Sequence, residues 1–133
     1  MEWNLKIIGI LLILLALTHL VFPRYFKWAI DLKGLALINR QMMYVHTVFI
    51  ALMLFLMGLM CITSSQELIE TKLGNRIDLG LAIFWATRLF VQFFIYSPDL
   101  WKGKKMESII HVVFSCMWTY VSIIFLLLYL KGI

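Results

Sequence analysis

Charged residues are scarce in this sequence. The 133 residues include only 12 Lys and Arg and 7 Asp and Glu, whereas 63% of the chain is hydrophobic. A water-soluble domain of this length has too little interior to bury so much apolar surface. The scarcity of charge therefore argues against an ordinary soluble fold and indicates an integral membrane protein.

Several catalytic signatures are also missing. The sequence contains no HExxH or paired-histidine motif, no GxSxG nucleophile elbow and no Walker loop. No two carboxylates share one apolar stretch, so hydrolysis by a conventional acid–base pair is not supported. The two cysteines, Cys61 and Cys116, lie at different depths of different stretches. We expect them to be small buried side chains and not a disulfide.

The sequence is rich in long apolar stretches, and four are long enough to span a bilayer: residues 4–22, 39–62, 77–97 and 108–130. Each is close to the ~20 residues that a helix needs to cross ~30 Å of hydrocarbon. Backbone polar groups in lipid must be satisfied within the segment, so these stretches predict helices. No small-x-small cleavage site follows the first stretch, which is therefore expected to be retained. We expect one all-α domain, residues 1–133, with four transmembrane helices in an up-down-up-down bundle.

The connections between these stretches have features of their own. Pro23 is expected to end the first helix, because proline has no backbone N–H to donate. The aromatic and basic residues of segment 23–35 are expected to lie along the membrane interface. Ser64 with Glu67 forms a capping-box pattern that predicts a short interfacial helix, and Gly74 is its expected end. Aromatic residues at span ends, such as Tyr96 and Trp101, are expected to form an interfacial belt.

Basic residues are distributed unequally between the two sides of the membrane. Seven lie in the first and third connections: Arg24, Lys27, Lys33, Arg40, Lys102, Lys104 and Lys105. Four lie on the other side: Lys6, Lys72, Arg76 and Lys131. Cytoplasmic loops carry an excess of Lys and Arg, so this bias predicts a plasma or inner membrane protein with both termini outside the cytoplasm. The net charge of +5 favours contact with anionic lipid headgroups over nucleic acid.

In three of the four stretches the polar residues share one face. On the third stretch this face consists of Asp78, Trp85, Arg88, Gln92 and Tyr96, within an arc of ~80°. On the second it consists of Asn39, Met43, His46, Ile50, Met53, Met57 and Met60. On the fourth it consists of His111, Ser115, Trp118, Ser122, Phe125 and Tyr129. Polar groups avoid lipid, so we expect the three faces to meet.

All three histidines fall in the half of the membrane beside the basic connections. His19, His46 and His111 are each on the order of 7–11 Å from the midpoint of their span, in one layer with Gln92. Arg88 lies just inward of this layer, near the middle of its stretch, where a charged side chain costs ~2.5–3.5 kcal/mol. No acidic residue shares its layer. We therefore expect Arg88 to hold an anionic or electron-rich group that Gln92 orients.

Three classes of function fit this pattern. The first is a redox module or membrane-anchor subunit that binds a b-type haem or a quinone. In it, His46 and His111 ligate the haem, while Arg88 pairs with a propionate or a quinone carbonyl. The predicted cofactor-binding residues are His46, His111, Arg88, Gln92, Trp85 and Trp118.

The second class is a zinc or copper site or pathway, in which His19, His46 and His111 are the ligands and the methionines of the second stretch assist copper. The third is an assembly subunit without a cofactor, whose polar faces satisfy the helices of a partner. In each class, large apolar faces remain for a homo-oligomer or for other membrane subunits.

Overall fold

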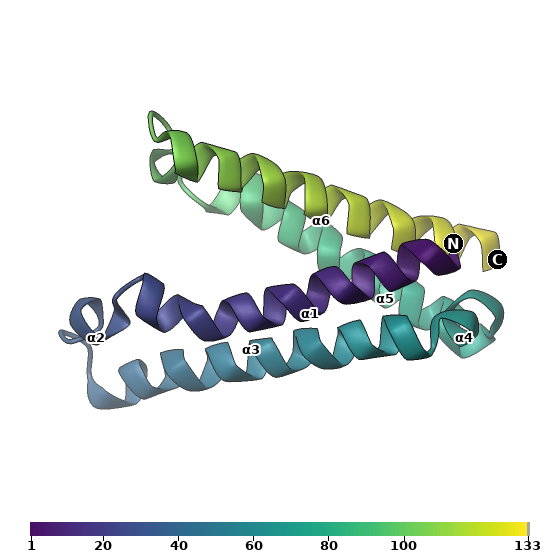
Figure 1. The fold of residues 1–133 in the computed structure, drawn as a ribbon, viewed down its shortest axis with the longest axis horizontal. Helices are drawn as coiled ribbons and strands as arrows, with labels where there is room; N and C mark the ends of the chain where they lie inside the picture. The colour runs from purple at the N-terminus through teal and green to yellow at the C-terminus, as the bar shows by residue number, and fades with distance from the viewer. Residues whose placement is uncertain (133) are drawn as a thin grey trace. The chain divides into compact units, whose positions relative to one another are not determined.

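The computed structural model describes residues 1–132, and every regular element in this range is a helix (Figure 1). The long helices are α1 (Glu2–Tyr25), α3 (Leu37–Thr63), α5 (Lys72–Phe90) and α6 (Lys105–Gly132). The short elements are α2 (Trp28–Asp31), α4 (Ser65–Glu70), the π-helical turn η1 (Val91–Ile95) and the 3-10 turn η2 (Pro98–Leu100). Since η1 extends α5, four segments are long and apolar enough to cross a membrane. The predicted all-helical class and its four candidate spans are confirmed.

The chain forms two compact units, of which one is Trp3–Ser65 and the other joins Met1–Glu2 to Gln66 and the residues beyond. In the first unit α1 and α3 meet at a pair of glycines. A Cβ atom built on Gly9 would lie 2.7 Å from the carbonyl oxygen of Gly58, and one built on Gly58 would lie 2.7 Å from that of Gly9. Small residues that let backbones approach are typical of helix packing in membranes.

In the second unit α5 and α6 form an antiparallel hairpin (Figure 1). Three pairs of residues are in contact across the hairpin: Asn75 with Tyr129, Trp85 with Trp118, and Gln92 with His111. Residue numbers increase along α5 while they decrease along α6, as expected for antiparallel helices. Between these pairs, α6 buries the apolar side chains of Val121, Phe125 and Leu128. The hairpin thereby brings the polar face of α5 against the polar face of α6, as the sequence predicts for these two helices.

Pro23 does not end the first helix. It lies inside α1, which continues to Tyr25. Proline removes only its own N–H donor, and the chain can close the next turn without it. Phe26 N donates to the Phe22 carbonyl at 2.9 Å. The predicted helix end at Pro23 is therefore wrong by about one turn.

Gly74 is also placed differently from the prediction. The short helix exists as α4, but Gly74 belongs to the first turn of α5, where its N–H donates to the N-cap hydroxyl of Thr71 at 2.9 Å. A Cβ atom at Gly74 would collide with the backbone of Glu67 and Leu68. The missing side chain lets α4 lie directly against α5, so this glycine allows a close contact and does not stop a helix.

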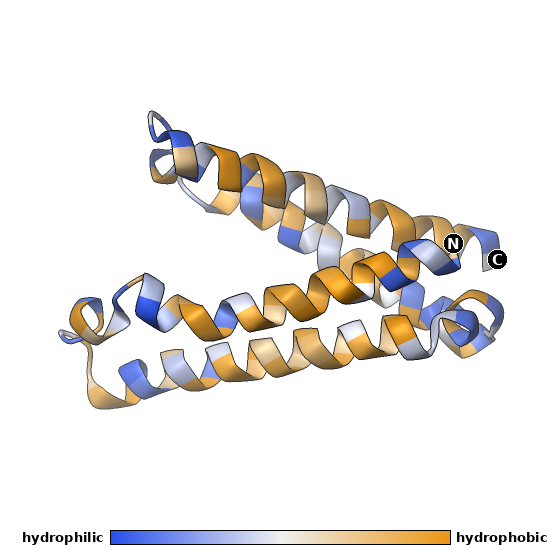
Figure 2. Ribbon diagram, in the orientation of Figure 1, coloured by the Kyte–Doolittle hydropathy of each residue, from blue (hydrophilic) through white to orange (hydrophobic). Residues whose placement is uncertain are grey.

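The surfaces of the long helices are apolar over most of their length, and hydrophilic residues gather toward the helix ends (Figure 2). Large side chains such as Leu14, Phe49 and Phe84 are about half exposed or more. Exposed apolar surface on this scale is typical of a membrane or interaction surface. It agrees with the length and hydropathy of the four candidate spans.

Candidate functional site in the α5–α6 hairpin

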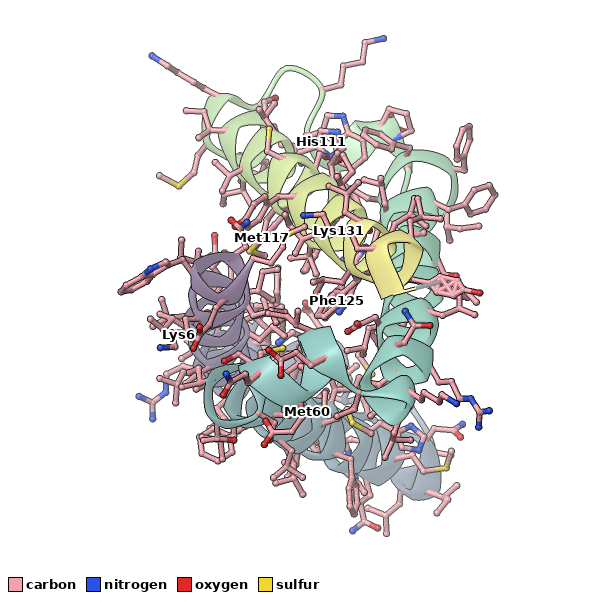
Figure 3. All side chains as sticks on the ribbon, turned by 90° about the vertical axis from the view of Figure 1, so that its right-hand side faces the viewer. Lys6, Met60, His111, Met117, Phe125 and Lys131 are labelled. Carbon is pink, nitrogen blue, oxygen red and sulfur yellow. The ribbon has the colours of Figure 1, made fainter. Side chains whose placement is uncertain are left out.

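A chain of hydrogen bonds joins Arg88, Gln92 and His111. Arg88 Nη1 donates to Gln92 Oε1 at 3.3 Å, and Gln92 Nε2 lies 2.7 Å from His111 Nδ1. Arg88 and Gln92 are one helical turn apart, so they share a face of the α5–η1 segment, and Gln92 is only 6% exposed. His111 comes from the first two turns of α6, at the opposite end of that helix from Lys131 (Figure 3). We call these three residues the Arg–Gln–His chain.

The Arg–Gln–His chain has a defined direction. A guanidinium group can only donate, so the amide oxygen of Gln92 must face Arg88 and its NH₂ group must face His111. Nδ1 of His111 is then an acceptor, and a neutral imidazole carries its proton on Nε2. His111 therefore presents an N–H donor on the side of the ring away from Gln92.

Aromatic rings stabilise the Arg88 charge. The guanidinium carbon lies 4.9 Å from the ring centroid of Trp118 and 5.3 Å from that of Tyr96. Trp118 in turn stacks on Trp85, with centroids 5.2 Å apart and planes at 13°. No carboxylate of residues 1–132 contacts Arg88. Ring faces attract cations by ~0.5–2 kcal/mol each, so the charge is stabilised without being neutralised.

Two further rings fix the orientation of His111. Trp101 stacks on the imidazole with centroids 3.8 Å apart and planes at 13°, and Phe93 meets it edge-on at 5.9 Å. The carbonyl of Trp101 accepts a hydrogen bond from Ser108 Oγ, which ties the connection between the helices to α6. The imidazole is thus held on two sides by rings and at Nδ1 by an amide.

The backbone around Gln92 departs from α-helical geometry. Residues Val91–Ile95 form a π-helical turn, and Tyr96 N donates to the Val91 carbonyl at 3.1 Å. π-helical turns contain one residue more than an α-turn and often occur at functional sites. The wider turn here contains Gln92 and ends at Tyr96, so its geometry determines where the two side chains that contact Arg88 from this side lie.

Some buried polar atoms lack a hydrogen-bond partner within residues 1–132. They are Nε1 of Trp85, Nε1 of Trp118, and both carboxylate oxygens of Asp78. The two indole groups are donors and belong to the aromatic stack beside Arg88. Asp78 is ten residues from Arg88, about 15 Å along the helix. The end of the hairpin that contains Arg88 and His111 is therefore rich in donors and poor in acceptors.

The structure brings together five of the six predicted cofactor-binding residues: Arg88, Gln92, His111, Trp85 and Trp118. The sixth, His46, belongs to the other unit, where it is exposed on α3. His19 belongs to the same unit as His46, and its Nδ1 lies 2.9 Å from the Leu15 carbonyl. Among residues 1–132, neither unit contains a group of three His, Cys, Asp or Glu side chains that could hold a metal ion. The three-histidine metal site stays a prediction.

Two further site residues are Trp101 and Tyr96. The sequence prediction assigned Trp101 only to an interfacial belt, whereas it placed Tyr96 also on the polar face of the third stretch. Both follow from hairpin geometry, because a connection as short as Tyr96–Lys104 keeps its aromatic residues close to the ends of both helices. Helical periodicity could not place Trp101, since it lies outside a regular helix. Comparison with known protein families, with curated proteins and with solved structures found no match to this chain.

Proposed function

We propose that this chain is a small integral membrane protein that binds a quinone at the end of the α5–α6 hairpin, as a redox module or as the membrane-anchor subunit of a redox complex. The observation that carries the proposal is the direction of the Arg–Gln–His chain. It leaves His111 Nε2–H as a donor on the side of the ring away from Gln92, and the Arg88 guanidinium has donors beyond the one that reaches Gln92.

Quinones fit this arrangement because their carbonyl oxygens only accept hydrogen bonds. A quinone at this end of the hairpin would accept one hydrogen bond from His111 and one from Arg88, and the Trp101 ring that stacks on His111 would lie beside it. The positive charge of Arg88 is not neutralised by a carboxylate, so it would favour the electron-rich carbonyl oxygen. Binding pockets of this type combine apolar walls with a few directed polar groups.

A b-type haem ligated by His46 and His111 is less well supported. Haem iron binds the lone pair of an imidazole nitrogen. In His111 the Nδ1 lone pair already accepts from Gln92, and Nε2 carries the proton in the neutral ring. Ligation would require the other tautomer and the loss of the bond to Gln92. The same argument applies to zinc or copper at His111.

The membrane context belongs to the same proposal. The four long segments span the bilayer in an up-down-up-down bundle, with the termini outside the cytoplasm and the basic connections at the anionic cytoplasmic surface. Because the third segment starts at Lys72, Arg88 lies about 7 Å past its midpoint and not at it. The cost of its charge is correspondingly smaller, since that cost falls toward the interface.

The proposal predicts that Arg88 is required for quinone binding and not for folding. Arg88→Leu removes a charge-assisted hydrogen bond of about 1.5–3 kcal/mol and should weaken quinone affinity roughly 10- to 150-fold. Arg88→Lys keeps the charge but loses the planar fork of donors, so its loss should be intermediate. Affinity is measured in lipid nanodiscs by quenching of tryptophan fluorescence, and quinone content by solvent extraction of the purified protein.

Arg76 provides a matched control, because it lies exposed on the same helix. Arg76→Leu should leave affinity unchanged. A Soret band in the purified protein that disappears in a His111→Ala variant would support the haem class instead. If the wild type holds neither quinone nor haem and Arg88→Leu raises thermal stability, the chain is better described as an assembly subunit.

A further inference from the structure

A shallow apolar groove starts beside His111 and follows α6 toward its middle. It is lined by Phe93, Ser115, Cys116, Thr119 and Tyr120, and its volume is about 420 Å³. We call it the tail groove.

The tail groove is continuous with the Arg–Gln–His chain. Phe93 follows Gln92 directly, and its ring meets the His111 imidazole edge-on at 5.9 Å. Ser115 lies one turn beyond His111, and its Oγ donates to the His111 carbonyl at 2.7 Å. The same two residues are among those that line the groove. A ligand whose polar end reaches His111 can therefore continue directly into the groove.

The walls of the tail groove suit a hydrocarbon. The lining surface is almost entirely apolar although three of its residues bear hydroxyl groups. Ser115 Oγ donates to the His111 carbonyl, and Thr119 Oγ1 donates to the Ser115 carbonyl at 2.8 Å. Both hydroxyl protons are thus used on the backbone of α6, and these two residues place mainly carbon toward the groove.

The direction of the groove suits a lipid-like molecule. His111 is about 11 Å from the midpoint of α6, by helix rise, whereas Thr119 and Tyr120 lie at that midpoint. In a membrane-spanning α6, the polar end of the ligand would lie toward the surface and its tail toward the centre of the bilayer. A second groove of about 240 Å³, lined by residues such as Ala86, Ser122 and Ile123, includes no residue of the Arg–Gln–His chain.

We infer that the tail groove binds the isoprenoid tail of the quinone whose ring is held at His111 and Arg88. The ligand class is therefore a prenylated, membrane-resident quinone, and a small soluble quinone or anion lacks the part that fills the groove. This inference rests on the proposed function, because it takes the ring position from it.

The test places a phenyl ring in each groove in turn. Cys116→Phe fills the tail groove, and Ile123→Phe is its control in the second groove; both positions are exposed on α6. Two probes are compared in nanodiscs by tryptophan fluorescence quenching: a fully methylated benzoquinone without a tail, and a trimethylated benzoquinone that carries an isoprenoid tail. Cys116→Phe should weaken binding of the tailed probe by about tenfold or more and leave binding of the tailless probe unchanged. Ile123→Phe should change neither.

Equal affinity of wild type and Cys116→Phe for the tailed probe would overturn the inference and leave the proposed function intact. Loss of tailed binding in Ile123→Phe instead would assign the tail to the second groove and also overturn it. If neither probe quenches the wild type, the proposed function fails, and the inference fails with it. Displacement of a co-purified phospholipid, with no quinone bound, would assign the groove to a lipid acyl chain and overturn the assignment to quinone.

Discussion

Asp78 is the residue whose environment least fits its chemistry. Its side chain is 1% exposed, it lies within an apolar candidate span, and neither carboxylate oxygen has a partner among residues 1–132. An unsatisfied buried polar group destabilises a fold by about 1–3 kcal/mol, and more when it is charged. Buried acidic groups in membrane segments are commonly functional. Here the carboxylate is about 15 Å from Arg88 along the helix, outside the Arg–Gln–His chain.

Replacing this carboxylate by a hydrocarbon should stabilise the protein. Asp78→Leu replaces two unsatisfied oxygens by hydrocarbon, so the free energy of unfolding should rise by about 1–3 kcal/mol. Asp99→Leu, at an exposed position of η2, should change it by less than about 0.5 kcal/mol. Unfolding is followed by circular dichroism in detergent. A marked loss of stability in Asp78→Leu would contradict the prediction and indicate that Asp78 binds a proton or cation that the fold requires.

At this scale the sequence predicts the site well where a helix determines it. Arg88, Gln92 and Trp85 fall on one face by the 100° rotation per residue, and the antiparallel hairpin then adds His111 and Trp118. The stacking of Trp101 on His111 depends on the path of a connection, which has no such periodicity. The direction of the hydrogen-bond chain depends on atomic positions and could not be predicted from residue types alone.

At the scale of elements, α1 and α3 are held by a backbone contact that only glycine permits. A Cβ atom on either Gly9 or Gly58 would lie 2.7 Å from the carbonyl oxygen of the other glycine. It would also crowd a larger side chain, Ile62 for Gly9 and Ile13 for Gly58. If these helices span a membrane, the surrounding lipid is as apolar as they are, and their association then depends on close packing more than on the hydrophobic effect. The contact should consequently be sensitive to a single methyl group.

Gly9→Ala should separate the two helices and lower stability by about 1–3 kcal/mol, the usual effect of overpacking. Gly80→Ala is the matched control, because a Cβ atom there meets nothing within 4 Å. That substitution should be neutral or should stabilise α5 by up to about 1 kcal/mol through helix propensity. Thermal unfolding in detergent measures both. Equal changes in thermal stability for Gly9→Ala and Gly80→Ala would be evidence against the glycine contact.

The face of α3 that packs against α1 was not predictable from polarity. The polar stripe of that helix contains His46, whereas the buried residues are Thr47, Ala51, Leu54, Met57, Gly58 and Cys61. Of the predicted stripe, only Met57 is buried. Small side chains carry little weight in a pattern based on polarity, although they decide how closely helices approach.

At the scale of the whole molecule, composition predicted the number of candidate spans and their helical structure, because hydropathy is a sum over many residues. Helix ends were less predictable. Pro23 and Gly74 both resemble stop signals, yet one lies inside a helix and the other in a first turn. The helix continues past Pro23 because Phe26 N donates to the Phe22 carbonyl in the next turn. Gly74 lies in a first turn because its missing side chain makes room for the backbone of Glu67 and Leu68.

The proposed topology places the N-terminus, the C-terminus and α4 on one side of the membrane, and α2 and η2 on the other. Reporter fusions at both termini should therefore give the same extracytoplasmic signal, and a fusion after Lys102 should give the cytoplasmic one. The reason is the excess of Lys and Arg in the connections that hold α2 and η2. Termini on opposite sides would rule out four spans, and a common cytoplasmic location would reverse the orientation.

The π-helical turn at Val91–Ile95 has a consequence for how this site could arise or be lost. One residue fewer would restore an ordinary α-helix, because the wide turn is equivalent to a single insertion. The deletion would keep the apolar span and place Tyr96 seven residues after Arg88, which is two turns of an ordinary α-helix and therefore the same face. The contact between Arg88 and Tyr96 would thus survive the loss of one residue, whereas the backbone that now positions Gln92 would change.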